Sequence, residues 1–132
     1  MSEAEKNAEI VRRAYAAFNA ADIETLVETF DENASWHTPG KSPIAGIAKG
    51  RDAVFEQFGR YGGSTENTFK ALLKDVLWSE SGNVVGIHHN TATRDGKQLD
   101  TYCLITFKLE NGRIVEGREH FADLYNWDAF WS

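Results

Sequence analysis

The chain has 132 residues, a mass of 14.8 kDa and a net charge of −6, with 14 basic and 20 acidic side chains. This length provides one core and room for an internal cavity, which excludes a two-domain enzyme. An apolar content of 42% excludes intrinsic disorder, and no apolar stretch approaches the roughly 20 residues of a membrane-spanning helix. We therefore expect a single domain over residues 1–132.

The distribution of charge indicates which partners to expect. Nucleic-acid binding relies on clustered Lys and Arg, whereas the basic residues here are scattered among more numerous acids. Neither nucleic acid nor an anionic membrane surface is therefore an expected partner. The single cysteine, Cys103, cannot form an intramolecular disulfide, and residues 1–7 carry acids instead of an apolar signal region. We expect a cytoplasmic protein.

Two helices are predicted at the N-terminus. Ser2 and Glu5 form a capping-box pattern, and apolar residues then recur at helical spacing up to about Asn19. Asp22 is a candidate N-cap for a second helix, whose apolar positions from Ile23 onward keep the same spacing.

A short strand, a loop and a third helix are expected next. Residues 33–38 are typical of a strand, and residues 39–50, with both prolines and three of the eleven glycines, are typical of a loop. The third helix is predicted from about Arg51 to Gly62-Gly63. Its inner face carries Val54, Phe55, Phe58 and Tyr61.

The second half of the chain predicts an antiparallel sheet. Runs rich in Thr, Val, Ile, Leu and aromatic residues are separated by turn signals such as Asp95-Gly96 and Asn111-Gly112. Asp123 is a candidate cap for a last helical turn. Helices packed on one curved sheet give an α+β domain whose concave face can enclose a pocket. The strands are expected at about 67–78, 84–94, 97–109 and 113–122.

Three segments carry a resemblance to a known family. They are residues 22–27 (Asp-Ile-Glu-Thr-Leu-Val), 33–36 (Asn-Ala-Ser-Trp) and 111–116 (Asn-Gly-Arg-Ile-Val-Glu). With the element order, the chain resembles the nuclear transport factor 2-like superfamily, and most of all its SnoaL-like and ketosteroid-isomerase-related members. The resemblance implies a homodimer of cone-shaped α+β barrels, in which three N-terminal helices pack on a curved antiparallel sheet around an internal cavity. It indicates fold more than function, because the superfamily includes several enzyme classes and non-catalytic proteins.

The functional residues of ketosteroid isomerases do not carry over to this sequence. The position of the family's carboxylate base falls on Thr38, whose hydroxyl cannot replace a carboxylate. The position of the protonated Asp falls on Cys103, a weak hydrogen-bond donor. The tyrosine position falls on Ala14, next to Tyr15. The usual isomerase route is therefore not expected.

The residues of epoxide hydrolases and polyketide cyclases carry over only in part. The hydrolase Arg-x-Asp pair reads Gln98-Leu99-Asp100, so the arginine is missing. The late-strand carboxylate of both classes falls on Ala122, one residue before Asp123. Asp123 is thus either an acid/base group presented by a strand bulge or the N-cap of the last helical turn, which we favour.

Strand alternation predicts which polar side chains face the cavity. His88 and Asn90 are expected to point inward, as is Glu119, unless a bulge presents His120 instead. A carboxylate beside an imidazole orients it and raises its pKa, so His88 with Glu119 is the main acid/base candidate. The alternatives are a His88 that is only hydrogen-bonded in the core, or one that serves a nucleophilic Cys103 as its base.

The candidate site is therefore a pocket for a small, uncharged, hydrophobic molecule. No metal or cofactor is expected, because no His or acidic pair has ligand spacing on one face and the phosphate-loop and dinucleotide patterns are absent. The catalytic candidates are His88, Glu119 and Asp123. The expected ligand contacts are Tyr15, Phe18, Trp36, Thr38, Phe55, Phe58, Asn90, Cys103, Phe121 and Trp127.

Two functions remain open on the sequence alone. The first is a cofactor-independent isomerase, cyclase or hydrolase that works by acid/base chemistry. The second is a ligand-binding or structural dimer without catalysis, which the missing isomerase and hydrolase groups favour. The aromatic C-terminus is expected either to cover the cavity or to pack into the dimer. The outer sheet face, expected to form the dimer contact, carries His89, Thr91, Thr93, Asp100 and Tyr102.

Overall fold

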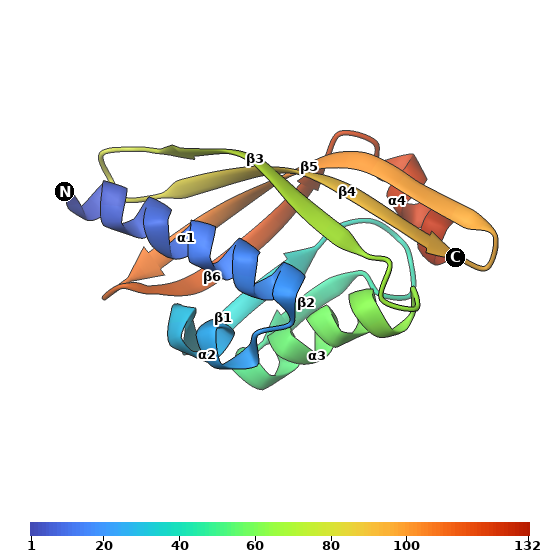
Figure 1. The fold of residues 1–132 in the computed structure, drawn as a ribbon, viewed down its shortest axis with the longest axis horizontal. Helices are drawn as coiled ribbons and strands as arrows, with labels where there is room; N and C mark the ends of the chain where they lie inside the picture. The colour runs from blue at the N-terminus through green and yellow to red at the C-terminus, as the bar shows by residue number, and fades with distance from the viewer.

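Two helices, two strands, a third helix, four strands and a last helix follow one another along the chain and form an α+β fold around a single sheet (Figure 1). The computed structural model describes residues 1–132. The helices are α1 (Glu3–Ala20), α2 (Ile23–Thr29), α3 (Arg51–Gly63) and α4 (Leu124–Trp131). The strands are β1 (Phe30–Thr38), β2 (Gly46–Lys49), β3 (Lys70–Trp78), β4 (Val84–Arg94), β5 (Lys97–Glu110) and β6 (Arg113–Phe121). None of the helices has the length and apolar character needed to span a membrane.

Three helix N-termini have the caps that the sequence predicts. The Ser2 side chain accepts a hydrogen bond from the Glu5 N–H, and the Glu5 side chain accepts from the Ser2 backbone, which completes the capping box of α1. Asp22 caps α2 by accepting from the Thr25 N–H. Asp123 caps α4 by accepting from the Asn126 N–H at 3.0 Å, so the favoured interpretation of Asp123 is confirmed.

The six strands form a mixed sheet in the order β2-β1-β6-β5-β4-β3. The predicted meander of β3 to β6 is antiparallel, but β1 pairs with β6 in parallel, so the expectation of a purely antiparallel sheet is wrong. The expected loop at 39–50 also contains β2, which pairs with β1. A four-residue strand next to two glycines carries too little periodicity to be predicted, because it exists only through pairing with its neighbour.

The first three helices cover one face of the curved sheet. In Figure 1, α1 crosses that face along β3 and β4, while α2 and α3 lie below it next to β1. The last helix, α4, packs against β5 and β6 at the other end of the sheet, close to the C-terminus (Figure 1). Its aromatic residues Trp127, Phe130 and Trp131 are buried within the same chain, where Trp127 and Trp131 contact Tyr61 and Phe69. The C-terminal helix therefore folds back onto the same chain and packs behind Tyr61 and Phe69.

Two glycines let aromatic rings lie directly on the sheet. A Cβ at Gly117 in β6 would lie 2.2 Å from the Trp36 ring, and one at Gly86 in β4 would lie 2.6 Å from the Tyr15 ring. No side chain fits at such separations, so both positions require glycine. The two rings are thereby held against the inner face of the sheet, where the candidate site lies.

Candidate functional site

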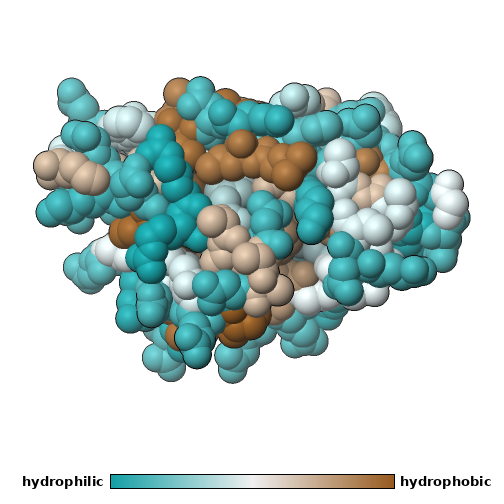
Figure 2. All heavy atoms as spheres, in the orientation of Figure 1, coloured by the Kyte–Doolittle hydropathy of each residue, from teal (hydrophilic) through white to brown (hydrophobic).

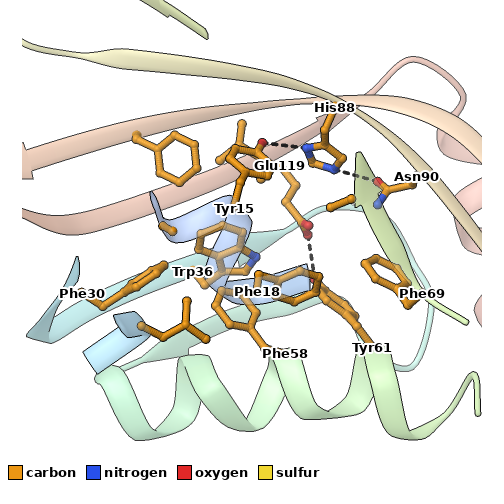
Figure 3. A pocket seen from close by; sticks show the side chains of 15 residues that line it. Tyr15, Phe18, Phe30, Trp36, Phe58, Tyr61, Phe69, His88, Asn90 and Glu119 are labelled. Atoms are coloured by element: carbon orange, nitrogen blue, oxygen red, sulfur yellow. Dashed lines mark hydrogen bonds between the residues drawn. The ribbon is translucent and has the colours of Figure 1, made fainter. Parts of the chain in front are cut away.

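A small interior cavity lies between α1, α3 and the inner face of the sheet (Figure 3). Its volume is about 40 Å³, and 12 of its 15 lining residues are hydrophobic, so it favours an apolar molecule. The lining residues are Ala14, Tyr15, Phe18, Leu26, Phe30, Trp36, Phe58, Tyr61, Phe69, Ala71, His88, Asn90, Ile105, Phe107 and Glu119. Cavities that hold one benzene ring measure about 150 Å³, so side chains must move before a ligand of that size can enter.

Aromatic side chains fill most of the space between the helices and the sheet. Phe58 of α3 meets Trp36 and Phe18 edge to face, with ring centroids 4.9 and 5.3 Å apart. Among the lining aromatics, only Phe18 and Phe58 are half-buried, whereas the others are buried. The contact between Phe18 and Phe58 is therefore the place where the cavity comes nearest to solvent.

Glu119 extends from β6 into the cavity and is only 6% exposed. Its Oε1 accepts a hydrogen bond of 2.8 Å from the Tyr61 hydroxyl, and it takes part in no ion pair (Figure 3). Burial raises the pKa of Glu119 to about 7, although the hydrogen bond from Tyr61 and the nearby Thr38 hydroxyl and Trp36 N–H, which are not bonded to it, partly oppose the shift. His120 is exposed, so β6 presents Glu119 to the cavity and not its neighbour.

The titratable groups that face Glu119 from the other elements carry no positive charge. Burial raises the pKa values of Tyr15 on α1 and Tyr61 on α3 well above the usual tyrosine value, and the charge of Glu119 raises both further. Burial likewise raises the pKa of the Cys103 thiol on β5. A thiol held in its neutral form is a poor nucleophile, so Cys103 behaves as a small apolar core residue.

His88 has two hydrogen-bond partners, and neither is Glu119. The Tyr15 hydroxyl lies 2.7 Å from Nδ1, and the Asn90 Oδ1 lies 2.9 Å from Nε2. The Asn90 amide nitrogen donates to the Lys70 carbonyl, which fixes its oxygen toward His88. The imidazole therefore carries its proton on Nε2 and accepts from Tyr15 at Nδ1. Burial lowers the pKa of His88 to about 4, so the ring is neutral at pH 7.

The predicted pairing of His88 with Glu119, and the raised imidazole pKa, are therefore wrong. Strand register gives the reason: His88 lies opposite Cys103 in β5, whereas Glu119 lies opposite Ile105. The two residues are thus separated by the whole width of β5 and by two positions along it. The backbones of β4 and β6 are two strand spacings apart, which is roughly 10 Å. Two side chains that point in the same direction from these strands cannot span that distance with one hydrogen bond.

Several expected contacts lie outside the interior cavity. Cys103 is in the core behind the lining, and Phe55 packs against Phe30 at a centroid distance of 5.7 Å. Phe121 stacks on Trp127 at 4.0 Å in the cluster next to α4. Asp123 is exposed at the start of α4, so it does not reach the cavity. The structure does bring Tyr15, Phe18, Trp36, Phe58, His88, Asn90 and Glu119 together around the cavity.

Thr38 lies at the boundary between the cavity and a second hollow. A polar groove of about 240 Å³ lies between β1, β2 and α3, and its lining includes Thr38, Gln57 and Arg60. The Thr38 hydroxyl lies 3.0 Å from the Tyr61 hydroxyl and accepts a hydrogen bond of 3.2 Å from the Gln57 amide. Trp36 lines both hollows.

Sequence reasoning missed Tyr61, Gln57 and Phe69 as site residues. The sequence could have identified Tyr61 as a site residue, because it lies three residues after Phe58 on the inner face of the third predicted helix. Gln57 offers no such signal, since a polar side chain in a helix usually faces solvent.

The Trp36 indole points toward Glu119 and has an unused donor. Its Nε1 is buried and has no hydrogen-bond acceptor, and Figure 3 shows this edge directed at the Glu119 carboxyl. The indole nitrogens of Trp127 and Trp131 also lack acceptors, but these residues do not line the cavity. The structure brings no three His, Cys, Asp or Glu side chains close enough together to hold a metal ion.

Comparison with known proteins places the chain in a family. The model for the SnoaL-like domain matches residues 11–117. Uncharacterized protein Rv0034 of Mycobacterium tuberculosis is 32% identical over 124 residues, which cover 94% of this chain and 95% of that protein. The structure of Bal32a, from a soil-derived mobile gene cassette, is 65% identical with a TM-score of 0.98, covering 99% of this chain and 100% of that one.

More distant structures share the fold alone. A candidate SnoaL-like polyketide cyclase from Jannaschia has a TM-score of 0.79 at 18% identity, covering 97% of this chain and 93% of that chain. Such low identity says nothing about a shared reaction. The predicted resemblance is nevertheless confirmed by sequence and structure together, and the chain belongs to the SnoaL-like domain family, with a fold of the nuclear transport factor 2-like type.

Proposed function

We propose that the interior cavity binds a small, uncharged, hydrophobic molecule with one polar oxygen, and that Glu119 is its acid/base group. The observation that carries the proposal is a buried carboxyl with a pKa of about 7 and no cationic partner. A carboxyl buried only for structure is normally paired with a cation, because an unpaired buried charge is costly. A group whose pKa lies near the ambient pH both gives and takes protons efficiently.

The chemistry of the site follows from the two forms of Glu119. As a carboxylic acid, it donates a hydrogen bond to a carbonyl or hydroxyl oxygen, and the unpaired Nε1–H of Trp36 supplies a second donor on the same side. As a carboxylate, it accepts a proton from the bound molecule. Because Glu119 can act both as an acid and as a base, the site suits a cofactor-independent isomerisation, cyclisation or hydrolysis. His88 serves as a positioning residue, because both of its nitrogens are engaged and it stays neutral.

The proposal is tested with three probes that share one ring system. The probes are 2-acetylnaphthalene, naphthalene and 2-naphthoate, which carry a neutral carbonyl, no polar group and a negative charge. We expect 2-acetylnaphthalene to give the largest rise in Tm at pH 6, and to lose affinity as Glu119 ionises between pH 6 and pH 8. In Glu119→Gln the amide stays neutral, so this pH dependence should disappear, while Glu110→Gln on the surface should keep it. A pH dependence that persists in Glu119→Gln contradicts the assignment.

A non-catalytic structural role is the second candidate. It is favoured by the cavity volume of about 40 Å³, since the aromatic side chains already fill most of the interior. Phe18→Ala would open the cavity where it comes nearest to solvent. If none of the three probes raises the Tm of the wild type or of Phe18→Ala, the binding proposal fails and the structural role remains.

The outer sheet face is proposed to pair with a second copy of the chain. Leu72 and Leu77 on β3 and Tyr102 and Leu104 on β5 are all between 39% and 49% exposed on that face. In Figure 2, hydrophobic atoms gather along β3 within a mostly hydrophilic surface. Exposed apolar groups of this kind are costly unless they are covered. Light scattering at micromolar concentration should give twice the chain mass of 14.8 kDa, and a mass near 14.8 kDa would exclude the dimer.

A further inference from the structure

Three hydrogen-bonded groups connect Glu119 to the polar groove. The Tyr61 hydroxyl donates to Glu119 at 2.8 Å, the Thr38 hydroxyl lies 3.0 Å from that of Tyr61, and Gln57 donates to Thr38 at 3.2 Å. Glu119 and Tyr61 line the interior cavity, whereas Thr38 and Gln57 line the groove. The chain of hydroxyl groups therefore begins in one hollow and ends in the other.

The direction of these hydrogen bonds is fixed by Arg60. Its guanidinium donates to the Gln57 Oε1 at 3.0 Å, so the Gln57 Nε2 must face Ile44 and Thr38. The Thr38 oxygen then accepts from Gln57 and its proton points to Tyr61, while the Tyr61 proton points to Glu119. Every O–H bond in the chain is thus directed from the groove toward the carboxyl, as a proton relay requires.

We propose that Thr38 and Tyr61 form a proton relay that exchanges the Glu119 proton with solvent in the groove while the interior cavity stays closed. The inference rests on the proposed acid/base role of Glu119. In one passage, hydronium in the groove gives a proton to the Thr38 oxygen, Thr38 gives its own proton to Tyr61, and Tyr61 gives its own to the Glu119 Oε1. Each hydroxyl ends with one proton, the carboxylate becomes the acid, and water remains in the groove.

The other polar groups around Glu119 do not lead to solvent. Tyr15 on α1 directs its proton to His88 on β4, and from there the hydrogen bonds pass to Asn90 and end at a backbone carbonyl of β3. The Trp36 Nε1–H on β1 has no acceptor, and the Cys103 thiol on β5 is directed at a backbone oxygen. No charged side chain lines the cavity besides Glu119 itself. The relay is therefore the one polar path from this carboxyl to the polar groove.

The relay is tested by the rate at which Glu119 takes up a proton after a rapid drop in pH. The uptake is followed by time-resolved infrared absorption of the protonated carboxyl, assigned to Glu119 by its absence in Glu119→Gln. Thr38→Val keeps the shape of the side chain but removes the hydroxyl, and should slow uptake on the order of 100-fold, within the range that a positioned proton transfer contributes. Thr38→Ser should restore the rate.

Thr29→Val is the matched control, because Thr29 is equally buried but bonds only to a backbone carbonyl within its helix. Uptake in Thr38→Val at the wild-type rate overturns the relay and shows that protons enter through the cavity. If Thr38→Val does not fold, the relay is tested instead by how the wild-type rate of proton uptake depends on the deuterium fraction of the solvent. The relay moves three protons together and gives a curved dependence on the deuterium fraction, whereas a linear dependence overturns it.

The same titration separates the relay from the function on which it rests. An equilibrium midpoint near pH 7 with an unchanged rate in Thr38→Val removes the relay and leaves the role of Glu119 intact. A midpoint at the ordinary glutamate value in the wild type removes the acid/base role itself.

Discussion

Replacing Glu119 by glutamine should change the pH dependence of stability in a predictable direction. The folded-state pKa of Glu119 is about 7, and the ordinary value, which applies to the unfolded chain, is 4.5. The folded protein therefore binds this proton more tightly, so the contribution of Glu119 to stability falls as the pH rises from about 4.5 to about 7 and stays low above it. The separation of the two pKa values corresponds to about 3 kcal/mol.

His88 opposes this effect in the wild type. Its folded-state pKa of about 4 lies below the ordinary value of 6.5, so its contribution is complete above pH 6.5 and is lost as the pH falls toward 4. The two slopes nearly cancel over the same range, which hides both in the wild type. In Glu119→Gln the His88 contribution is no longer opposed, so the stability of the variant should rise between pH 4 and pH 6.5.

The measurement is urea unfolding of the wild type and Glu119→Gln at pH 4, 5, 6, 7 and 8. The stability of the variant minus that of the wild type should increase by about 3 kcal/mol from pH 4 to pH 8. Groups common to both proteins cancel in this difference, and Glu110→Gln controls for the loss of one negative charge. A difference that stays constant over this range would refute the raised pKa of Glu119 and the function that rests on it.

Three further predictions follow from close packing. Gly117→Ala should destabilise the protein by about 1 to 3 kcal/mol in urea, because its Cβ would lie 2.2 Å from the Trp36 ring; an unchanged midpoint would mean that the ring is free to move. Trp127→Ala should cost about 3 to 5 kcal/mol in the same assay, since it removes the fully buried ring stacked on Phe121; a loss below about 1 kcal/mol would show that α4 is not part of the core. Cys103 should resist a thiol reagent in the native protein and react once urea unfolds it, and rapid labelling of the native state would contradict its burial.

Local patterns were enough to predict most of the fold. The caps at Ser2, Asp22 and Asp123 depend on a side chain three residues from the amide that it binds, so they can be read from the sequence. Alternation along β4 and β6 correctly turned His88 and Glu119 inward, because successive side chains of a strand must point to opposite faces. The four strands of the meander were found for the same reason, with turn residues between them.

The partners of the inward-facing side chains were decided only by tertiary structure. Alternation assigns a face but no position across the sheet, and the register of β4, β5 and β6 keeps His88 and Glu119 apart. Each residue is instead hydrogen-bonded to a tyrosine on a helix. His88 bonds to Tyr15 on α1, and Glu119 bonds to Tyr61 on α3. The sequence by itself thus determined a SnoaL-like α+β fold with these polar groups inside. Their separation, and with it their opposite pKa shifts, arose from how the strands and helices pack, because hydrogen bonds and burial depend on distances that no local pattern encodes.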